Sequence, residues 1–72
     1  MHLITVIQIT VNSEARTLVA GATVAALLAQ MNLAGKRVAV ERNGEIVPKG
    51  RHAATLLASG DALEIVVAVG GG

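Results

Sequence analysis

The residues with the clearest chemical potential are the three glycines that close the sequence, Gly70, Gly71 and Gly72. Glycine has no Cβ, so this stretch can pass through a channel that is too narrow for any side chain and can adopt almost any backbone conformation. Three extended residues reach about 10 Å. We therefore expect the glycines to enter the active site of a partner enzyme and to present an unhindered carboxylate at Gly72.

A carboxylate is a poor electrophile at neutral pH, so the end of the chain would need activation before it could react. Adenylation by ATP would create a good leaving group, and a sulfur nucleophile could then displace AMP and leave a thiocarboxylate at Gly72. A glycine-rich end is a weak signal by itself, because chain ends often fray. Here the glycines follow an apolar segment with no polar linker between them, which favours a functional tail.

No other group of residues predicts a reaction. The histidines, His2 and His52, have no cysteine or helical His pair near them, so a metal site is not expected and His52 is expected at the surface. Asp61 follows Gly60 and is expected to serve a turn. Nucleophile–base pairs, paired carboxylates and a phosphate-binding loop are not found. The sequence therefore favours a co-substrate of other enzymes over an enzyme.

Size and composition predict one small domain, residues 1–69, followed by a flexible tail, residues 70–72. The sequence has no Cys, Phe, Tyr or Trp, so the core must consist of aliphatic side chains and Met. A net charge of +1 and the lack of aromatic residues disfavour nucleic-acid binding. No apolar run is long enough to cross a membrane, and the start does not look like a signal peptide. The lack of cysteine suits the cytoplasm, where we expect the protein.

The first half of the sequence predicts a hairpin and a helix. Residues 6–12 alternate between apolar and polar side chains, "NSEA" (residues 12–15) has turn chemistry, and residues 16–19 form a short second strand. The period then changes, because the spacing of Val24, Leu27, Leu28 and Met31 places them on one helical face. Thr23 is the expected N-cap, and Asn32 and Gly35 suit the helix exit.

The second half predicts another hairpin, a short helical turn and a last strand. The hairpin turns at Asn43-Gly44 and ends at Pro48. Residues 51–61 look like a helical turn that points Ala53, Leu56 and Leu57 inward. The last strand, residues 62–69, is apolar on both faces, which is typical of a central or docked strand. One helix covers only one face of a small sheet, so Val66 and Ala68 could form a partner surface. Scattered surface residues are the equally weighted alternative.

Five of the six cationic residues lie between Lys36 and Arg51. This cluster could dock an acidic partner. Glu41 and Glu45 interrupt it, so we favour a solvated face with local ion pairs.

Two segments, "RVAVERNGEIVP" and "LLASGDALEIVVAVGGG", resemble the ThiS-type sulfur carrier proteins of thiamine biosynthesis. The most specific features are Asn43-Gly44-Glu45, Gly60-Asp61, Glu64-Ile65 and the final Val69-Gly70-Gly71-Gly72. The resemblance covers nearly the whole chain from about Ile9. It implies an α+β fold of the ubiquitin-like β-grasp type, with a mixed sheet of about five strands on one main helix and a short helical turn.

The resemblance also implies a mechanism and partners. An E1-like adenylyltransferase would adenylate Gly72, and a sulfur donor system (a cysteine desulfurase or an equivalent) would convert it to the thiocarboxylate, 1-thioglycine. Thiazole synthase would then take the sulfur. No bound cofactor is implied, and the residues carried over are Gly71 and Gly72. The sequence departs from the family pattern in its extra N-terminal residues, at Ala20, where Asp is common, and at Ala53, where an aromatic is common.

Three alternatives remain open. The small subunit of molybdopterin synthase uses the same chemistry, but its approach to the glycines tends to be more polar than "VVAVGGG". A ubiquitin-like modifier would instead be joined to lysines through Gly72. A plain interaction module would not use its tail at all, and loss of Gly71 and Gly72 would leave its function intact.

Overall fold

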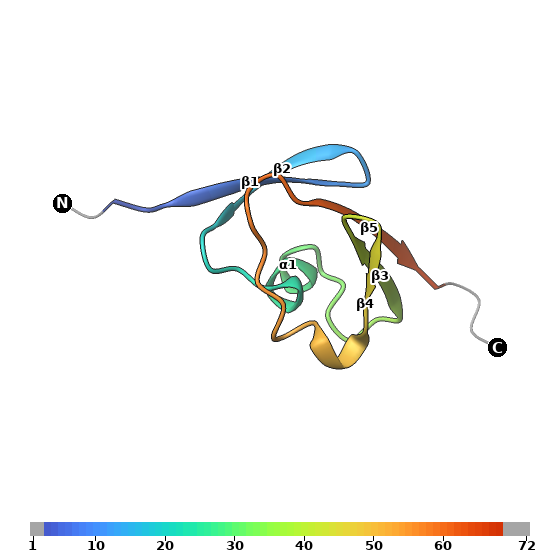
Figure 1. Cartoon of the computed structure of the whole chain (residues 1–72). Helices are drawn as coiled ribbons and strands as arrows, with labels where there is room; N and C mark the ends of the chain where they lie inside the picture. The colour runs from blue at the N-terminus through green and yellow to red at the C-terminus, as the bar shows by residue number, and fades with distance from the viewer. Residues whose placement is uncertain (1–2, 69–72) are drawn as a thin grey trace.

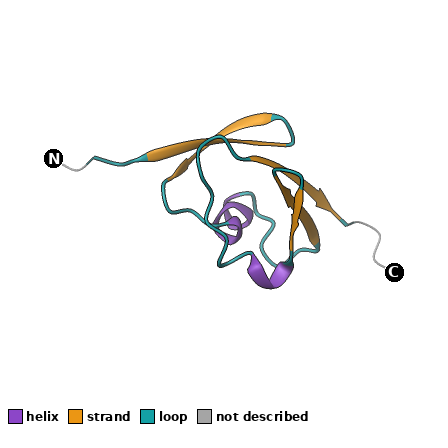
Figure 2. Ribbon diagram, in the orientation of Figure 1, coloured by secondary structure: helices purple, strands orange, loops and turns teal. Residues whose placement is uncertain are grey.

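The computed structural model describes residues 3–68 as one mixed sheet with the two helical segments packed on the same side of it (Figures 1 and 2). The predicted order of elements is confirmed. In chain order the elements are β1 (Val6–Val11), β2 (Glu14–Val19), α1 (Val24–Gln30), β3 (Val38–Arg42), β4 (Glu45–Val47), the 3-10 helix η1 (Lys49–Arg51) and β5 (Ala62–Val67). Val69 and the predicted glycine tail lie outside the described residues.

The five strands are arranged in the order β2-β1-β5-β3-β4. Strand β5 is last in the chain but central in the sheet, between the two hairpins, and it leads to the end of the molecule opposite the start of β1 (Figure 1). It runs antiparallel to β3 and parallel to β1. Of the arrangements that two apolar faces predict (central, covered or docked), the structure shows the central one.

Helix α1 begins and ends where the sequence predicts. The Thr23 hydroxyl accepts a hydrogen bond from the N–H of Ala26 at 3.1 Å, which caps the first turn. After the helix, Asn32 and Gly35 adopt positive φ angles of 60° and 79° and turn the chain back toward the sheet. The buried face of the helix joins a core that is entirely aliphatic: Ile9, Val11, Leu18, Val24, Leu27, Leu28, Val40, Val47, Leu57, Leu63 and Ile65.

Both hairpins turn on two residues with positive φ. In the second hairpin these are Asn43 and Gly44, with φ of 52° and 85°, as predicted. In the first they are Asn12 and Ser13, with φ of 51° and 69°. The four-residue turn predicted there was too long, because Glu14 and Ala15 already belong to β2. A two-residue turn matches the twist of the strands that it joins, and Asn tolerates the positive φ that it needs.

The predicted helical turn over residues 51–61 was wrong in position and in orientation. The helical segment η1 begins earlier and overlaps the predicted range only at Arg51, although the N–H groups of Ala54 and Thr55 still donate to the carbonyl oxygen of Arg51. Of the three residues predicted to point inward, Ala53 and Leu56 are exposed and Leu57 is buried. In this segment, the side chain of His52 points inward instead. The residue is 8% exposed, and its Nε2 lies 3.0 Å from the carbonyl oxygen of Val47. The expectation of a surface histidine was therefore also wrong.

The side chain of Asn12 extends the contact between β1 and β5. The parallel ladder itself contains only the pairs Thr10–Ala62 and Val11–Leu63. Beyond it, Asn12 Nδ2 donates to the carbonyl oxygen of Ile65 at 3.1 Å, and Asn12 Oδ1 accepts from the N–H of Ile65 at 2.8 Å. A turn residue thus supplies two hydrogen bonds that a longer strand would otherwise make.

We predict that Asn12→Gly lowers the free energy of unfolding by about 1–3 kcal/mol, because it leaves the N–H and C=O of buried Ile65 without partners. Glycine accepts the positive φ, so the backbone of the turn is preserved. The matched control is Ser13→Gly in the same turn, which should change stability by no more than about 0.5 kcal/mol. Urea unfolding followed by far-UV circular dichroism is suitable because the chain has no Trp or Tyr. Equal losses in the two variants would contradict the role of the Asn12 side chain.

Candidate functional site

The end of β5 positions the residues from which the predicted tail departs. Val66 is 65% exposed, and Ala68 is also exposed, and both alternate with the buried Ile65, so the two predicted surface residues lie on the open face of the sheet. The N–H of Ala68 donates to the carbonyl oxygen of Arg37 at 2.9 Å. The last described residue is therefore held to the segment that enters β3, and any reactive end beyond it starts from a fixed point.

An apolar surface surrounds this departure point on the open face of the sheet. We call it the outer patch: Ala39, Ile46, Val66 and Ala68. Ala39 pairs with Val66 across β3 and β5, and Ile46 is 66% exposed on β4. Glu41 and Glu64 are also cross-strand partners on this face. Two like charges directly opposite each other are unfavourable, so a partner that covers the outer patch would gain from a cation placed over this pair.

The other end of β5 is anchored by Asp61. Its carboxylate accepts hydrogen bonds from Arg42 Nε at 2.8 Å, from Asn43 Nδ2 at 3.0 Å and from the N–H of Ala58 at 2.8 Å. Asn43 Oδ1 in turn accepts from the N–H of Ala62 at 2.9 Å. The turn role predicted for Asp61 is confirmed, but the sequence did not show that this residue joins the second hairpin to the start of β5.

The environment of Asp61 keeps it ionised. Burial raises the pKa of the carboxyl group, but the hydrogen bonds from Ala58, Arg42 and Asn43, together with the charge of Arg42, outweigh this effect and hold the pKa below its ordinary value of 3.8. A carboxylate that is ionised at neutral pH and accepts three hydrogen bonds suits a structural role and not proton transfer. Among residues 3–68, no three His, Cys, Asp or Glu side chains gather as metal ligands would, and no helix could cross a membrane.

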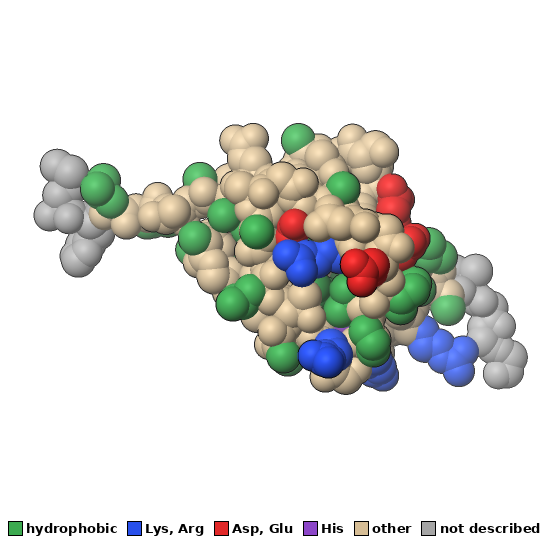
Figure 3. All heavy atoms as spheres, in the orientation of Figure 1, with side chains coloured by type: hydrophobic (Ala, Val, Ile, Leu, Met, Phe, Trp, Pro, Cys, Tyr) green, Lys and Arg blue, Asp and Glu red, His purple; other side chains and the backbone are tan. Residues whose placement is uncertain are grey.

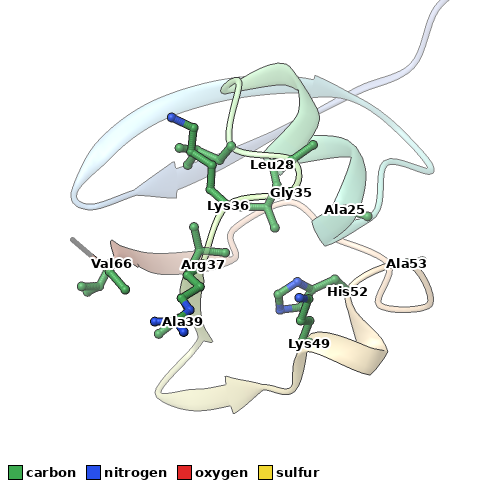
Figure 4. A pocket seen from close by; sticks show the side chains of 14 residues that line it. Ala25, Leu28, Gly35, Lys36, Arg37, Ala39, Lys49, His52, Ala53 and Val66 are labelled. Atoms are coloured by element: carbon green, nitrogen blue, oxygen red, sulfur yellow. The ribbon is translucent and has the colours of Figure 1, made fainter. Parts of the chain in front are cut away.

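A groove with a volume of about 600 Å³ lies beside the end of β5 (Figure 4). Its walls come from α1, from the segment of residues 33–39, from η1 with the two residues that follow it, and from the end of β5. The lining is mainly apolar. Lys36, Arg37 and Lys49 are its charged residues, and His52 lies in its wall. Sequence reasoning missed this groove, because it exists only where segments far apart in the chain meet.

The comparisons with known proteins decide the family. Residues 9–72, which include the three glycines, match the model of the ThiS family. The chain belongs to the ThiS family. The crystal structure of a thiamine biosynthesis protein (ThiS) from Geobacter metallireducens is 33% identical, superposes with a TM-score of 0.77, and covers 92% of this chain and 100% of its own. The predicted β-grasp fold is confirmed.

Two curated relatives of this ThiS-family chain are much longer than it is. They are the thiazole synthases of Paramagnetospirillum magneticum, 46% identical over 65 residues, and of Magnetococcus marinus, 38% identical over 65 residues. Each match covers 90% of this chain but only 20% of the relative. The chain therefore spans about a fifth of the length of these relatives.

The bonded state of Asp61 predicts a pH dependence of stability. Its pKa is lower in the folded chain than in the unfolded one, so the stabilisation is present above the unfolded pKa and is lost as the pH falls through the folded pKa. We expect the free energy of unfolding to decrease between about pH 5 and pH 2, and Asp61→Asn to weaken this dependence. At neutral pH the variant should be about 1–3 kcal/mol less stable.

Urea unfolding at pH 7, 5 and 3, followed by circular dichroism, would measure both effects. Glu14→Gln is the control, because Glu14 is exposed at the edge of the sheet, and it should follow the wild type at all three pH values. If Asp61→Asn kept the full pH dependence of the wild type, the folded chain would not depend on this carboxylate as the structure indicates.

Proposed function

We propose that this ThiS-family chain is a sulfur carrier that works as a co-substrate of other enzymes, with the carboxylate of Gly72 as its reactive group. The observation that carries the proposal is the family match, because it extends through Gly70, Gly71 and Gly72. The structure supports it by fixing the departure point of these residues at Ala68, beside the exposed outer patch. The described residues contribute a scaffold and docking surfaces, and the chemistry belongs to the tail.

The proposed reaction has two steps. A carboxylate oxygen of Gly72 attacks the α-phosphorus of ATP, so that pyrophosphate leaves and an acyl-adenylate forms. A sulfur nucleophile at the oxidation level of sulfide then attacks the acyl carbon, and AMP leaves with the electrons of the broken C–O bond. The product is a thiocarboxylate at Gly72. Gly71 and Gly72 leave the acyl carbon unhindered, whereas a side chain there would crowd both attacks.

The proposed partners follow from these steps and from the relatives. An E1-like adenylyltransferase performs the activation, and a cysteine desulfurase or an equivalent system, together with a thiol that reduces the persulfide by two electrons, supplies the sulfur at the level of sulfide. Thiazole synthase takes the sulfur for the thiazole ring of thiamine. Two relatives that bear the name thiazole synthase contain a stretch similar to this chain. The presence of a carrier-like segment within such a protein supports the proposal that the carrier and thiazole synthase act together.

The outer patch is the proposed docking surface for these partners. The four residues after Ala68 span at most about 14 Å, so an enzyme that holds Gly72 in its active site must also cover the surface around Ala68. Val66 and Ala68 lie on that surface, on the face of the sheet that α1 leaves open. Their role as partner contacts thus follows from the short reach of the tail.

The test is the intact mass of the purified chain after incubation with ATP, the adenylyltransferase and the sulfur donor from the same organism. We expect a gain equal to the exchange of one oxygen for sulfur. Deletion of Gly72 should abolish the gain, and Gly71→Val should slow it strongly. Gly50→Ala is the matched control, because a Cβ at Gly50 meets no atom within 4 Å. An unchanged mass with a demonstrably active enzyme would refute the proposal.

The molecule that accepts the sulfur distinguishes a carrier for thiamine biosynthesis from the alternative functions. Thiocarboxylated chain should lose its sulfur when thiazole synthase and its small-molecule substrates are added. Loss of sulfur only to the large subunit of molybdopterin synthase would assign the chain to molybdenum cofactor synthesis instead. Lysine adducts of Gly72 in a lysate would identify a protein modifier.

A further inference from the structure

The groove beside the end of β5 has a charge pattern that the carrier chemistry does not explain. Its lining includes Lys36, Arg37 and Lys49 but no Asp or Glu. The only salt bridge within residues 3–68 joins Arg42 to Asp61, so none of these three cations has an ionic partner in that part of the chain. The local ion pairs predicted for this cluster were therefore wrong for the residues of the groove.

The remainder of the lining is apolar and shaped by neighbouring elements. Leu28 and Ala25 of α1 form one wall, and Ala53 and His52 after η1 form another (Figure 4). The His52 ring is held in place by its contact with the Val47 carbonyl oxygen. The groove thus offers apolar walls bordered by ammonium and guanidinium groups, which suits an apolar side chain flanked by carboxylates.

The groove adjoins the point from which the tail departs. Ala68 and Val66 belong both to its lining and to the outer patch, and Ala68 is bonded to the backbone of Arg37. The following four residues span at most about 14 Å. An enzyme that holds the end of the tail must therefore lie close to the groove. In the view of Figure 3, basic side chains lie near the centre and along the lower border of the molecule, and acidic ones gather mainly higher on the right.

We propose that the groove docks an acidic segment of the adenylyltransferase that activates Gly72. The segment seats an apolar side chain between α1 and Ala53 and places carboxylates against Lys36, Arg37 and Lys49. This inference rests on the proposed function, but it concerns recognition and not chemistry. Charge complementarity favours this occupant. An apolar segment without carboxylates would leave the three cations without an ionic partner, and a basic segment would be repelled.

The surroundings of the outer patch strengthen the inference, because the charged residues beside it are acidic. Glu41 and Glu64 lie on the open face of the sheet, whereas the cations border the groove. A partner that contacts both surfaces must therefore present basic groups to one and acidic groups to the other. These two requirements restrict the orientations in which the carrier can lie on the adenylyltransferase.

The test is the steady-state adenylation of the chain, with the chain as the varied substrate of the adenylyltransferase from the same organism. We expect Lys36→Glu, Arg37→Glu and Lys49→Glu each to raise the KM for the chain about tenfold, with kcat within about twofold of the wild type. Arg51→Glu is the matched control: Arg51 is exposed and lies two residues from Lys49 but does not line the groove. It changes the net charge equally and should change KM less than about twofold.

A second variant tests the apolar part of the groove without a change of charge. Ala53 is exposed and lines the groove, so Ala53→Trp should fill it and raise the KM for the chain while the circular dichroism spectrum stays unchanged. An unaltered KM in Ala53→Trp and in the three groove variants would overturn the proposal. So would an equal rise in KM for Arg51→Glu, because that would show general electrostatic attraction.

Other occupants give different results. If the substitutions raised the KM for ATP and not for the chain, the groove would bind nucleotide phosphates, and the proposal would fail. A dimer of the chain in sedimentation velocity that Ala53→Trp dissociates would assign the groove to a second copy. Calorimetric titration of the adenylyltransferase with each variant measures docking even where no adenylate forms, so failure of the carrier chemistry and failure of the docking site are distinguishable.

Discussion

The central position of β5 is the constraint on which the rest of the structure depends. This strand follows both hairpins in the chain, yet it lies between them in the sheet. Its parallel contact with β1 is short, with two residue pairs. Side chains therefore complete the attachment: Asn12 on one side, and Asp61 with Arg42 and Asn43 at the start of the strand. Without these bonds the buried backbone groups of β5 would lack partners, at a cost that a domain this small can hardly tolerate.

The two hairpin turns do more than reverse the chain. Each begins with an asparagine at positive φ, Asn12 and Asn43, and each asparagine side chain also bonds the backbone of β5, at Ile65 and at Ala62. Asparagine is suited to both tasks, because it tolerates the left-handed conformation and carries both a donor and an acceptor. The turn geometry is thereby coupled to the register of the strand that leads to the tail.

The sequence predicted those parts of the fold that depend on local patterns. Alternation, the Thr23 cap and the Asn43-Gly44 turn each act within a few residues, and the structure contains all three. The prediction for residues 51–61 was wrong because it counted only apolar side chains as inward, whereas His52 is buried with a carbonyl partner on β4. The bonds of Asn12 to Ile65 and the groove were not predictable in this way, since they join residues that are distant in sequence. The glycine tail could be interpreted from its chemistry alone, and the family match includes it.

A short tail on a rigid domain ties chemistry to docking. Because Ala68 is bonded to Arg37 and the residues beyond it reach only about 14 Å, the proposed reactive end must lie close to the surface around Ala68 when a partner holds it. The surfaces on either side of Ala68 differ in charge, with Glu41 and Glu64 on the open face of the sheet and Lys36 and Lys49 at the groove. A domain with two similar faces could bind in either orientation and would often hold its tail away from the active site. In the proposed docking, the opposite charges restrict how the domain lies on its partner, and so restrict where the end of the chain is delivered.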